Sequence, residues 1–296
     1  MIPSVCKTEV NEDGLELVEH GNEAFPVAFY EDDFSMHPLP WHWHDELEVF
    51  LVVQGLVRFR TVSGEYILKE GEGLFINSGK LHAAWSNGME MSRFHSIVFH
   101  PRFVGGESNS IFWKKYLEPM LKNDSMRTVH LKETSGVHKE ILEHIEDAWQ
   151  LSKKETRGYE FLVREHLSKI LYLLDANYET SIHNLSDKQL RDAKRIKKML
   201  GYIDEHLEDE ITIENIARSA VISVSECLRC FKTTIGVTPI QYVRQVRIQK
   251  AVDLLLNTRL TITDVAMRCG FQEMSYFSKI FRQTHGVTPR EFRRGK

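Results

Sequence analysis

Four side chains in the first third of the chain carry groups that bind metal ions or polar small molecules. His42, His44 and Glu48 lie in the segment WHWHDELEVF, and His82 ends the segment GEGLFINSGKLH. Side chains at even spacing along a strand share one face, so the first three are expected to point the same way. Three imidazoles and a carboxylate can hold a first-row transition metal. The same groups can line an effector pocket or hydrogen-bond within the folded domain, and residue type alone leaves these alternatives open.

Short strands are expected to position these side chains. From Val27 to Phe99 the sequence consists of β-branched and aromatic runs, which Gly55, Gly64 and Gly71 interrupt. Evenly spaced strands without a helical pattern favour an antiparallel barrel or jelly roll. The four polar side chains are expected to converge on the interior of this barrel.

The last third of the chain contains a repeat. The segment IGVTPIQYVR at 235–244 returns as HGVTPREFRR at 285–294. Ser225 matches Ser275 and Phe231 matches Phe281 at an offset of 50 residues, so the similarity extends upstream of both segments. Each copy predicts two short helices joined by a tight turn, which is a helix-turn-helix, followed by a third helix.

The repeated GVTP is a helix stop followed by a helix start. Gly236 and Gly286 are expected to end a helix in the left-handed conformation. In each copy the threonine is an N-cap, the proline takes the first helical position, and a Gln or Glu completes a capping box. These residues are Thr238, Pro239 and Gln241 in the first copy and Thr288, Pro289 and Glu291 in the second. A further capping box is expected at Ser223 and Glu226, where the first reading helix begins.

Charge is distributed unevenly along the chain. From Arg191 to Lys296 there are 19 Lys and Arg against 12 Asp and Glu, a net charge of +7, while the remaining residues carry a net −11. A basic module on an acidic body is typical of nucleic-acid binding, although chance segregation of surface charge gives the same balance.

The stretch from about Asp192 to Arg294 resembles the DNA-binding domain of the AraC/XylS family of bacterial transcription regulators. The motifs ITIENIA, FKTTIGVTPIQYVRQVRIQKAVDLL and ITDVAMRCGFQEMSYFSKIFRQTHGVTPREFR carry this resemblance. It implies two helix-turn-helix units, at about 211–233 and 261–283, whose second helices read successive major grooves on one face of the duplex. The DNA-binding residues that it implies are Ser225, Leu228, Arg229, Lys232, Ser275, Ser278, Lys279 and Arg282.

The expected DNA contacts divide between bases and phosphates. Arg229 and Lys279 have the chemistry to pair with guanine O6 and N7. Lys232 and Arg282 are expected to contact phosphates, which position the protein without specifying sequence. Leu228 departs from the polar residue usual in the family, so it either contacts a thymine methyl or leaves the first helix a weak reader.

The N-terminal strands resemble the cupin barrel that serves as a sensor domain in this regulator family. The spacing H-x-H-x3-E from His42 and G-x5-N-x-G-x2-H from Gly71 carries the resemblance. Two positions depart from the cupin motifs, since Asn77 replaces the usual proline and the later asparagine is displaced to Asn87. The resemblance implies an effector-binding barrel that requires no cofactor and has a divalent metal as an optional occupant.

Two amphipathic helices are expected between the halves, in GVHKEILEHIEDAWQLSKK and YEFLVREHLSKILYLLDANY. The second places apolar residues at the i, i+3, i+4 spacing of one helix face. We expect an antiparallel hairpin whose stripe packs on the barrel or on a second subunit. A homodimer through this stripe, which includes Leu167, Ile170, Leu171 and Leu174, is the hypothesis.

The expected fold class is therefore α+β multidomain. A cupin-like antiparallel β-barrel takes residues 1–110, a helical hairpin 111–180, a linker 181–190, and an all-α tandem helix-turn-helix domain 191–296. No run of about 18 apolar residues is present, so a membrane span is not expected. The start lacks the basic-then-apolar pattern of a secretion signal, and a cytoplasmic location is the expectation.

The four cysteines are Cys6, Cys227, Cys230 and Cys269, too few for a disulfide scaffold. Cys227 and Cys230 form a C-x-x-C pair in the first reading helix, where the family has apolar residues. We expect them to pack in the core, with a redox switch or a metal site as the alternatives.

Together these features predict a transcription regulator of the AraC/XylS type that is not an enzyme. The expected partners are double-stranded DNA, a small-molecule effector, a second copy of the chain and RNA polymerase, with no membrane. A metal-dependent cupin enzyme fused to a DNA-binding domain is the main alternative. A constitutive architectural DNA-binding protein with a vestigial barrel is another.

Overall fold

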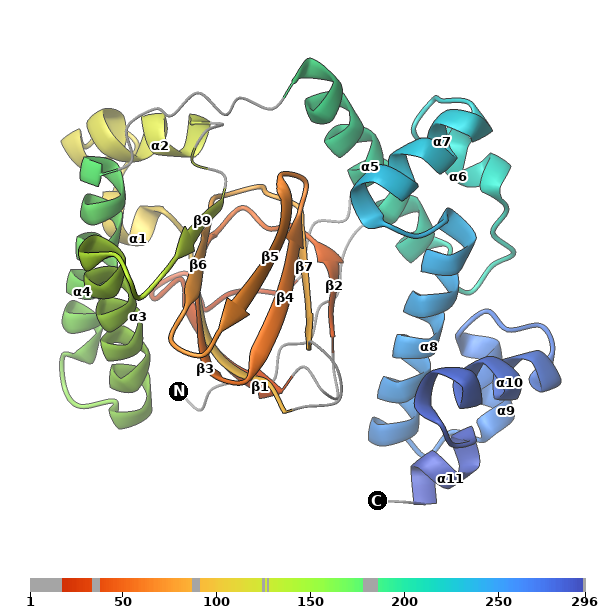
Figure 1. Cartoon of the computed structure of the whole chain (residues 1–296). Coiled ribbons are helices and arrows are strands. Elements are labelled where there is room, and N and C mark those ends of the chain that lie inside the picture. The colour runs from red at the N-terminus through yellow and green to blue at the C-terminus, as the bar shows by residue number, and fades with distance from the viewer. Residues whose placement is uncertain are drawn as a thin grey trace. The chain divides into compact units, whose positions relative to one another are not determined.

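The computed structural model describes residues 18–33, 38–86, 91–123, 126, 128–177 and 186–294. Within these residues the chain divides into two compact units, the first ending at Arg191 and the second beginning at Asp192 (Figure 1). Cys6 and Asn87 lie outside the described residues. No helix in the described part of the chain is long and apolar enough to cross a membrane.

The first unit is built on two antiparallel β-sheets, as expected for a cupin-like barrel. One sheet has five strands in the order β1-β8-β3-β6-β9, and the other has four in the order β2-β7-β4-β5. The strands are β1 (Val27–Asp33), β2 (Leu39–His42), β3 (Leu47–Gln54), β4 (Leu56–Thr61), β5 (Gly64–Lys69), β6 (Gly73–Ile76), β7 (His82–Ser86), β8 (Arg93–Phe99) and β9 (Thr128–Leu131).

The central strands of the five-stranded sheet are buried on both faces, which explains why they lack polar alternation. In β3, Phe50 and Val52 belong to the apolar core between the sheets. Leu47 and Val49 belong to a second core that includes the helices. Strand β4 of the other sheet instead alternates buried and half-buried residues, the pattern of a sheet with one solvated face.

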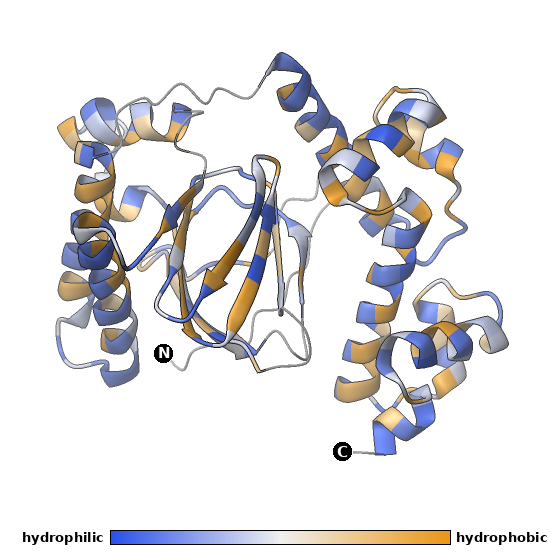
Figure 2. Ribbon diagram, in the orientation of Figure 1, coloured by the Kyte–Doolittle hydropathy of each residue, from blue (hydrophilic) through white to orange (hydrophobic). Residues whose placement is uncertain are grey.

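Helices cover the outer face of the five-stranded sheet (Figure 1). Trp149 of the first long helix is fully buried and donates from Nε1 to the Tyr30 carbonyl at 3.2 Å, which joins helix to sheet. Figure 2 shows apolar residues along both the strands and these helices. The helical elements are α1 (Arg102–Gly105), the π-helical turn η1 (Trp113–Leu117), α2 (Glu118–Lys122), α3 (Gly136–Lys154) and α4 (Tyr159–Asn177).

The segment 111–180 contains a strand as well as the helical hairpin expected there. Within it, β9 pairs with β6. Asn77, directly after β6, donates from Nδ2 to the carbonyls of Met120 at 2.8 Å and Met126 at 3.0 Å. The residue that replaces the usual cupin proline therefore holds the chain that leads into β9.

The expected linker 181–190 is partly helical. Residues 181–185 lie outside the described residues, and α5 (Asp187–Glu205) already begins at Asp187. Gln189 donates from its backbone N–H to Ser186 Oγ at 3.3 Å, and the Ser186 N–H donates back to Gln189 Oε1 at 3.0 Å. This capping box was not predicted from the sequence, and it starts the helix before the expected domain boundary.

The second unit begins within α5 and continues with two helix-turn-helix pairs joined by one long helix, α8 (Pro239–Asn257). The N-terminal part of α8 packs on the first pair, where the rings of Tyr242 and Phe231 lie 6.0 Å apart. Its C-terminal part joins a buried cluster with the second pair, including Ala251 and Phe281. The other elements are α6 (Ile213–Ser219), α7 (Val224–Cys230), the π-helical turn η2 (Phe231–Ile235), α9 (Ile262–Arg268), α10 (Met274–His285) and α11 (Pro289–Arg294).

The GVTP segments behave as expected. Gly236 and Gly286 end the two second helices with φ values of 93° and 75°, in the left-handed region that glycine tolerates. Thr238 and Gln241 form a complete capping box. The Thr288 N–H donates to the Glu291 carboxylate at 2.8 Å, and the Glu291 N–H donates to Thr288 Oγ1 at 3.3 Å.

Candidate effector site and DNA interface

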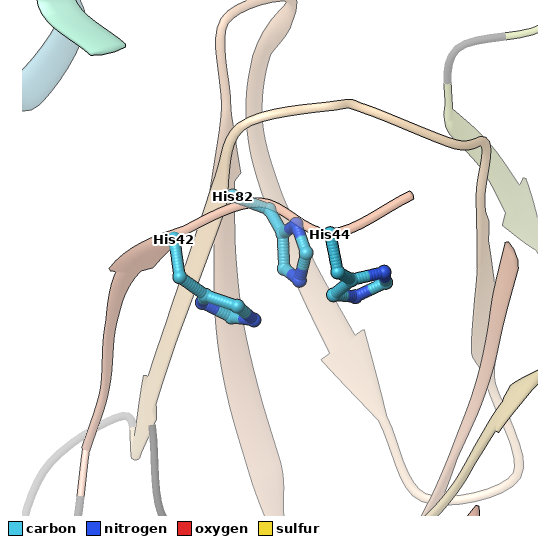
Figure 3. A group of neighbouring side chains, drawn as sticks. All are labelled: His42, His44 and His82. Atoms are coloured by element: carbon cyan, nitrogen blue, oxygen red, sulfur yellow. The ribbon is translucent and has the colours of Figure 1, made fainter. Parts of the chain in front are cut away.

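The four expected barrel residues come together. His42 ends β2 and is paired across the sheet with His82 at the start of β7. His44 follows β2, and Glu48 lies on β3. All four side chains are buried. The ring centroids of His42, His44 and His82 lie 4.1–5.7 Å apart, and Figure 3 shows the rings directed towards a common space.

The reason for this convergence differs from the one expected. The parity argument needs one continuous strand from His42 to Glu48, but β2 ends at His42 and β3 begins at Leu47. A turn lies between them, and the His44 carbonyl accepts a hydrogen bond from the Gly79 N–H at 2.8 Å. His44 therefore reaches the cluster because the turn is held against the loop that precedes β7.

Backbone carbonyls orient all three imidazoles. Nδ1 lies 2.9 Å from the Pro40 carbonyl in His42, 3.2 Å from the Glu46 carbonyl in His44, and 2.8 Å from the Lys80 carbonyl in His82. A carbonyl oxygen can only accept, so each Nδ1 must carry the proton in these bonds. In the neutral rings Nε2 then offers its lone pair, which is the arrangement that prepares histidine for a metal or a donor group.

Glu48 adds an anionic group to the cluster. Its Oε1 accepts a hydrogen bond from Ser96 Oγ at 2.6 Å, while Oε2 lies 3.1 Å from His82 Nε2 and 3.6 Å from His44 Nε2. Burial raises the pKa of Glu48, but the adjacent imidazoles of His44 and His82 outweigh it and hold the pKa well below its ordinary value. Glu48 is therefore a carboxylate at neutral pH.

Three atoms of this cluster are buried without a hydrogen-bond partner. They are His44 Nε2, His82 Nε2 and Glu48 Oε2, whose mutual contacts are close but poorly directed for hydrogen bonds. Buried polar atoms in folded proteins are nearly always satisfied, because leaving one unpaired costs about 1–3 kcal/mol. Partnerless atoms on three converging side chains therefore indicate a place for a ligand.

The donor set fits a transition metal. One nitrogen from each of His42, His44 and His82 lies within 4.8 Å of the others, as ligands of a single ion do. Imidazole nitrogens suit zinc, copper, iron and nickel. Glu48 contacts His44 and His82 at one side of this group.

Two other polar members of the site, Ser96 and His20, were not predicted from the sequence. Ser96 donates a hydrogen bond to Glu48. It alternates on β8 with the core residues Phe94 and Val98, and this even spacing is a signal in the sequence that could have placed Ser96 inside the barrel. His20 lies before the first strand, with its ring 5.2 Å from His44 and its Nδ1 2.8 Å from the Tyr30 hydroxyl. No periodic pattern could have revealed His20.

Two further groups of potential metal ligands lie within the described residues. His144 and Asp147 of α3 approach His166 of α4, and this group is partly exposed. The second group joins Asp192, Glu226 and Cys230, but its two carboxylates already bind Arg229. The barrel histidines are therefore the best-formed candidate.

The expected DNA-reading residues lie on α7, η2 and α10, and most of them face solvent. The exposed ones are Ser225, Leu228, Lys232, Ser275, Lys279 and Arg282. Ser278 and Arg229 are half-buried. The second helix of each pair thus has a solvent-exposed surface, but the two surfaces differ in charge because Arg229 is engaged within the protein.

Arg229 is held by two carboxylates of the same unit. Its Nη2 donates to Asp192 Oδ1 and Oδ2 at 2.8 and 2.9 Å, and its Nε donates to Glu226 Oε2 at 2.8 Å. Arg195 donates to the same Glu226 at 2.8 Å. The Arg229 and Arg195 guanidiniums lower the pKa of Glu226 to about 2. Base reading by Arg229 would require this network to open.

The capping box expected at Ser223 forms only in part. Ser223 Oγ accepts from the Glu226 N–H at 3.2 Å. The Glu226 carboxylate is occupied by Arg229 and Arg195, so it makes no return bond to the cap that starts α7.

The cysteine pair packs in the core, as expected. Cys227 and Cys230 are fully buried and free. Burial raises the pKa of each thiol to about 11, and the proximity of Asp192 adds to the effect on Cys230. The thiol, not the reactive thiolate, therefore dominates at neutral pH.

The apolar stripe of α4 does not form the expected dimer surface. Leu167, Ile170, Leu171 and Leu174 are buried in the core shared by the helices and the five-stranded sheet. The exposed apolar residues of α4 are instead Phe161, Leu162 and Tyr172. The periodic spacing of apolar residues in α4 therefore identified the helix face that packs inside the first unit, not a face that contacts a second subunit.

Known protein families match both units. An AraC-like ligand-binding domain matches residues 25–171, and a helix-turn-helix domain matches residues 216–295. The chain is 30% identical over 282 residues to an uncharacterized HTH-type transcriptional regulator, YdeC of Bacillus subtilis (strain 168), covering 94% of this chain and 95% of that protein. It is 23% identical over 286 residues to the HTH-type transcriptional activator RhaR of Mannheimia succiniciproducens, covering 95% and 97% of the two chains.

A solved structure with similar coverage is that of an apo ToxT variant from Vibrio cholerae. Its sequence identity with this chain is 15% and the TM-score is 0.47, with 93% of this chain and 98% of that chain covered.

Proposed function

The chain belongs to the AraC family of DNA-binding transcription regulators, and we propose that the barrel histidine cluster is the effector site that controls its DNA binding. The observation that carries this proposal is the set of buried, partnerless atoms on His44, His82 and Glu48. A cluster that served only to stabilise the barrel would satisfy these atoms internally. A ligand that satisfies them stabilises the state of the barrel to which it binds.

The chemistry of the cluster favours effectors that supply hydrogen-bond donors or positive charge. With each Nδ1 bonded to a carbonyl, the Nε2 of a ring in its neutral form is an acceptor, and Glu48 offers Oε2 as an anionic acceptor. A polyhydroxy compound can donate to these atoms, whereas a carboxylate effector would be repelled by Glu48. We therefore propose a hydroxyl-rich molecule or a divalent metal ion as the effector class.

A metal would be held by His42, His44 and His82, with Glu48 completing or orienting the set. When bound there, it would supply Lewis-acid coordination to the effector or act as the effector itself. Metal content of the purified full-length chain, compared with that of a His42→Ala/His82→Ala variant, tests this form of the proposal. Equal substoichiometric metal in both would leave the hydroxyl-rich effector as the surviving form.

A metal-dependent enzyme is the second candidate because three buried imidazoles also suit catalysis. The matched relatives are described as transcriptional regulators, and we propose that this chain likewise performs no turnover. Conversion of any compound that alters its DNA affinity, followed by mass spectrometry, separates the two. Detectable turnover that depends on His82 would establish the enzyme.

On the DNA side we propose an asymmetric division of labour between α7 and α10. Lys279 and Arg282 of α10 are exposed cations without a described ion pair, whereas Arg229 of α7 is engaged by Asp192 and Glu226. The second helix-turn-helix then supplies charged contacts to bases and phosphates. The first presents Ser225 and Leu228, which suit weak polar contacts and a thymine methyl.

We propose that the chain acts in the cytoplasm as a homodimer that contacts RNA polymerase. The exposed face of α4 is the candidate dimer surface, because Phe161 and Tyr172 are 80% and 61% exposed. Large aromatic residues at such exposure are favoured at protein interfaces.

A further inference from the structure

A cavity lies in the second unit, and most of the residues that line it are not among those expected to read DNA. It has a volume of about 570 Å³ and is bounded by α9, α10 and α11. Figure 1 shows these three helices packed together at the end of α8. Its walls include Ser278 of the reading helix α10 and three arginines of α11, namely Arg290, Arg293 and Arg294. The cavity is separate from the histidine cluster of the first unit.

Among the described residues, the cavity wall combines apolar residues with three arginines, the only charged side chains that line it. The acids nearest in sequence are directed to their own helix caps, since Asp264 accepts from the N-cap Thr261 and Glu291 accepts from the N-cap Thr288. Within the described residues neither Arg290, Arg293 nor Arg294 forms an ion pair. Three positive charges therefore border one cavity without a described carboxylate within ion-pair distance of any of them.

Arg293 carries the clearest sign of a missing partner. Its Nη1 donates to the Leu260 carbonyl, which anchors the side chain at 2.5 Å. Its Nε and Nη2 are buried and have no acceptor. Unpaired buried donors on a charged group are costly, and the cost falls when an anion accepts their hydrogen bonds.

We propose that this cavity binds a phosphate group through Arg293, with Arg290 and Arg294 as flanking cations. The planar guanidinium fork matches phosphate oxygens, and the cavity adjoins the helix that enters the groove. Ser278 then belongs to the phosphate site rather than to base reading. The inference rests on DNA binding by this unit, and it is independent of the effector proposed for the barrel.

The phosphate has two sources that share this chemistry, the DNA backbone and free phosphate. The first arm of the test uses the full-length chain and a duplex that the chain itself selects from a random-sequence pool. The variant Arg290→Gln/Arg294→Gln removes two exposed charges that make no described hydrogen bond. Arg293→Gln tests the anchored residue, and Arg157→Gln, at an exposed arginine of the first unit, is the charge-matched control for this single substitution.

For a backbone phosphate, the slope of log affinity against log salt falls by about 1 for each phosphate that the protein no longer binds. We expect this fall in Arg293→Gln and in the double variant, uniformly across base substitutions, and not in Arg157→Gln. Replacing single phosphates of the duplex by neutral methylphosphonate should weaken wild-type binding at several positions, one of which is the phosphate bound by this cavity. At that one position the replacement should leave the binding of Arg293→Gln unchanged.

The second arm measures the melting temperature of the full-length chain in inorganic phosphate and in chloride at equal ionic strength. A rise in phosphate that is abolished in Arg290→Gln/Arg294→Gln identifies free phosphate as a ligand of the site. The proposal is overturned if, in both arms, these variants behave like Arg157→Gln while the wild type still binds duplex. Failure of the wild type to select any duplex would instead overturn DNA binding itself.

Discussion

Arg229 of the first reading helix places its Nη2 2.8 Å from Oδ1 of Asp192, a nearly buried carboxylate on α5. This contact fastens α7 to the helix that opens the second unit. A guanidinium expected to read guanine is therefore part of the packing of its own domain. The same position in the second repeat is Lys279, which is exposed and remains available to DNA.

Arg229→Ala should destabilise the second unit by about 1–3 kcal/mol, because the buried Asp192 carboxylate then keeps only the longer contacts from Arg195 and Cys230. DNA affinity should fall equally on all sequences. Lys279→Ala should leave stability unchanged and cost about 1–3 kcal/mol at one base position. Chemical unfolding followed by circular dichroism, with binding to a panel of single-base variants, checks both. If Arg229→Ala loses DNA affinity at only one base position, Arg229 reads that base and the packing role is not its only one.

Acid should loosen the α5–α7 contact through Glu226. Its pKa is lowered to about 2 from 4.5, so it contributes stability above pH 4.5 that is lost as the pH falls towards 2. Hydrogen exchange of α7 peptides at pH 6, 4 and 3 should show protection falling in the wild type. Glu226→Gln should have lower protection at pH 6 and a weaker dependence on pH. If protection falls with pH in the same way in the wild type and in Glu226→Gln, titration of Glu226 is not the cause of the loss.

Val221→Gly should stabilise the second unit by about 1 kcal/mol. Val221 has φ 56° at the turn of the first helix-turn-helix, and Gly270 holds the matching turn of the second with φ 72°. A β-branched residue is strained in this region, and the 87% exposed side chain offers little packing in return. The control is Val287→Gly, at a residue without positive φ, which should not stabilise. The melting temperatures of the two variants and the wild type measure the effect. A loss of stability in both variants would contradict the proposed backbone strain at Val221.

Phe161→Ser/Tyr172→Ser should shift the full-length chain towards monomer, because these residues form the exposed aromatic face of α4. Ile67→Ser on β5 removes a comparably exposed apolar residue elsewhere and should leave the assembly unchanged. Sedimentation velocity at tens of micromolar measures the difference. A wild-type monomer at that concentration would rule out this surface.

The helix-turn-helix repeat was predictable because its signals are local. Gly236 and Gly286 need only their own backbone conformation, and each threonine caps a helix that starts one residue later. The Ser186 cap follows the same rule, but its helix begins in a stretch that is polar enough to resemble a linker. The role of Arg229 was not predictable because its partner Asp192 lies 37 residues away in sequence.

The sequence predicted the main residues that form the barrel site, but it predicted their geometry only in part. The H-x-H-x3-E spacing identified His42, His44 and Glu48, but the strand that was expected to align them is interrupted by a turn. β9 was missed because four residues leave no periodic signal and its partner β6 lies more than 50 residues earlier. The sequence left open whether the apolar stripe of α4 packs on the barrel or on a second subunit, because amphipathic periodicity does not say which apolar surface covers a helix face.

The most direct test of the effector proposal is the DNA affinity of the full-length chain measured across polyhydroxy compounds, carboxylates and divalent metal ions. We predict that at least one hydroxyl-rich compound or metal ion changes the affinity of the wild type by about fivefold or more. The same compound should leave His82→Ala and Glu48→Gln unresponsive, with their ligand-free DNA affinity intact. An effector that shifts the wild type and both variants equally would contradict the account and place the effector site outside the histidine cluster.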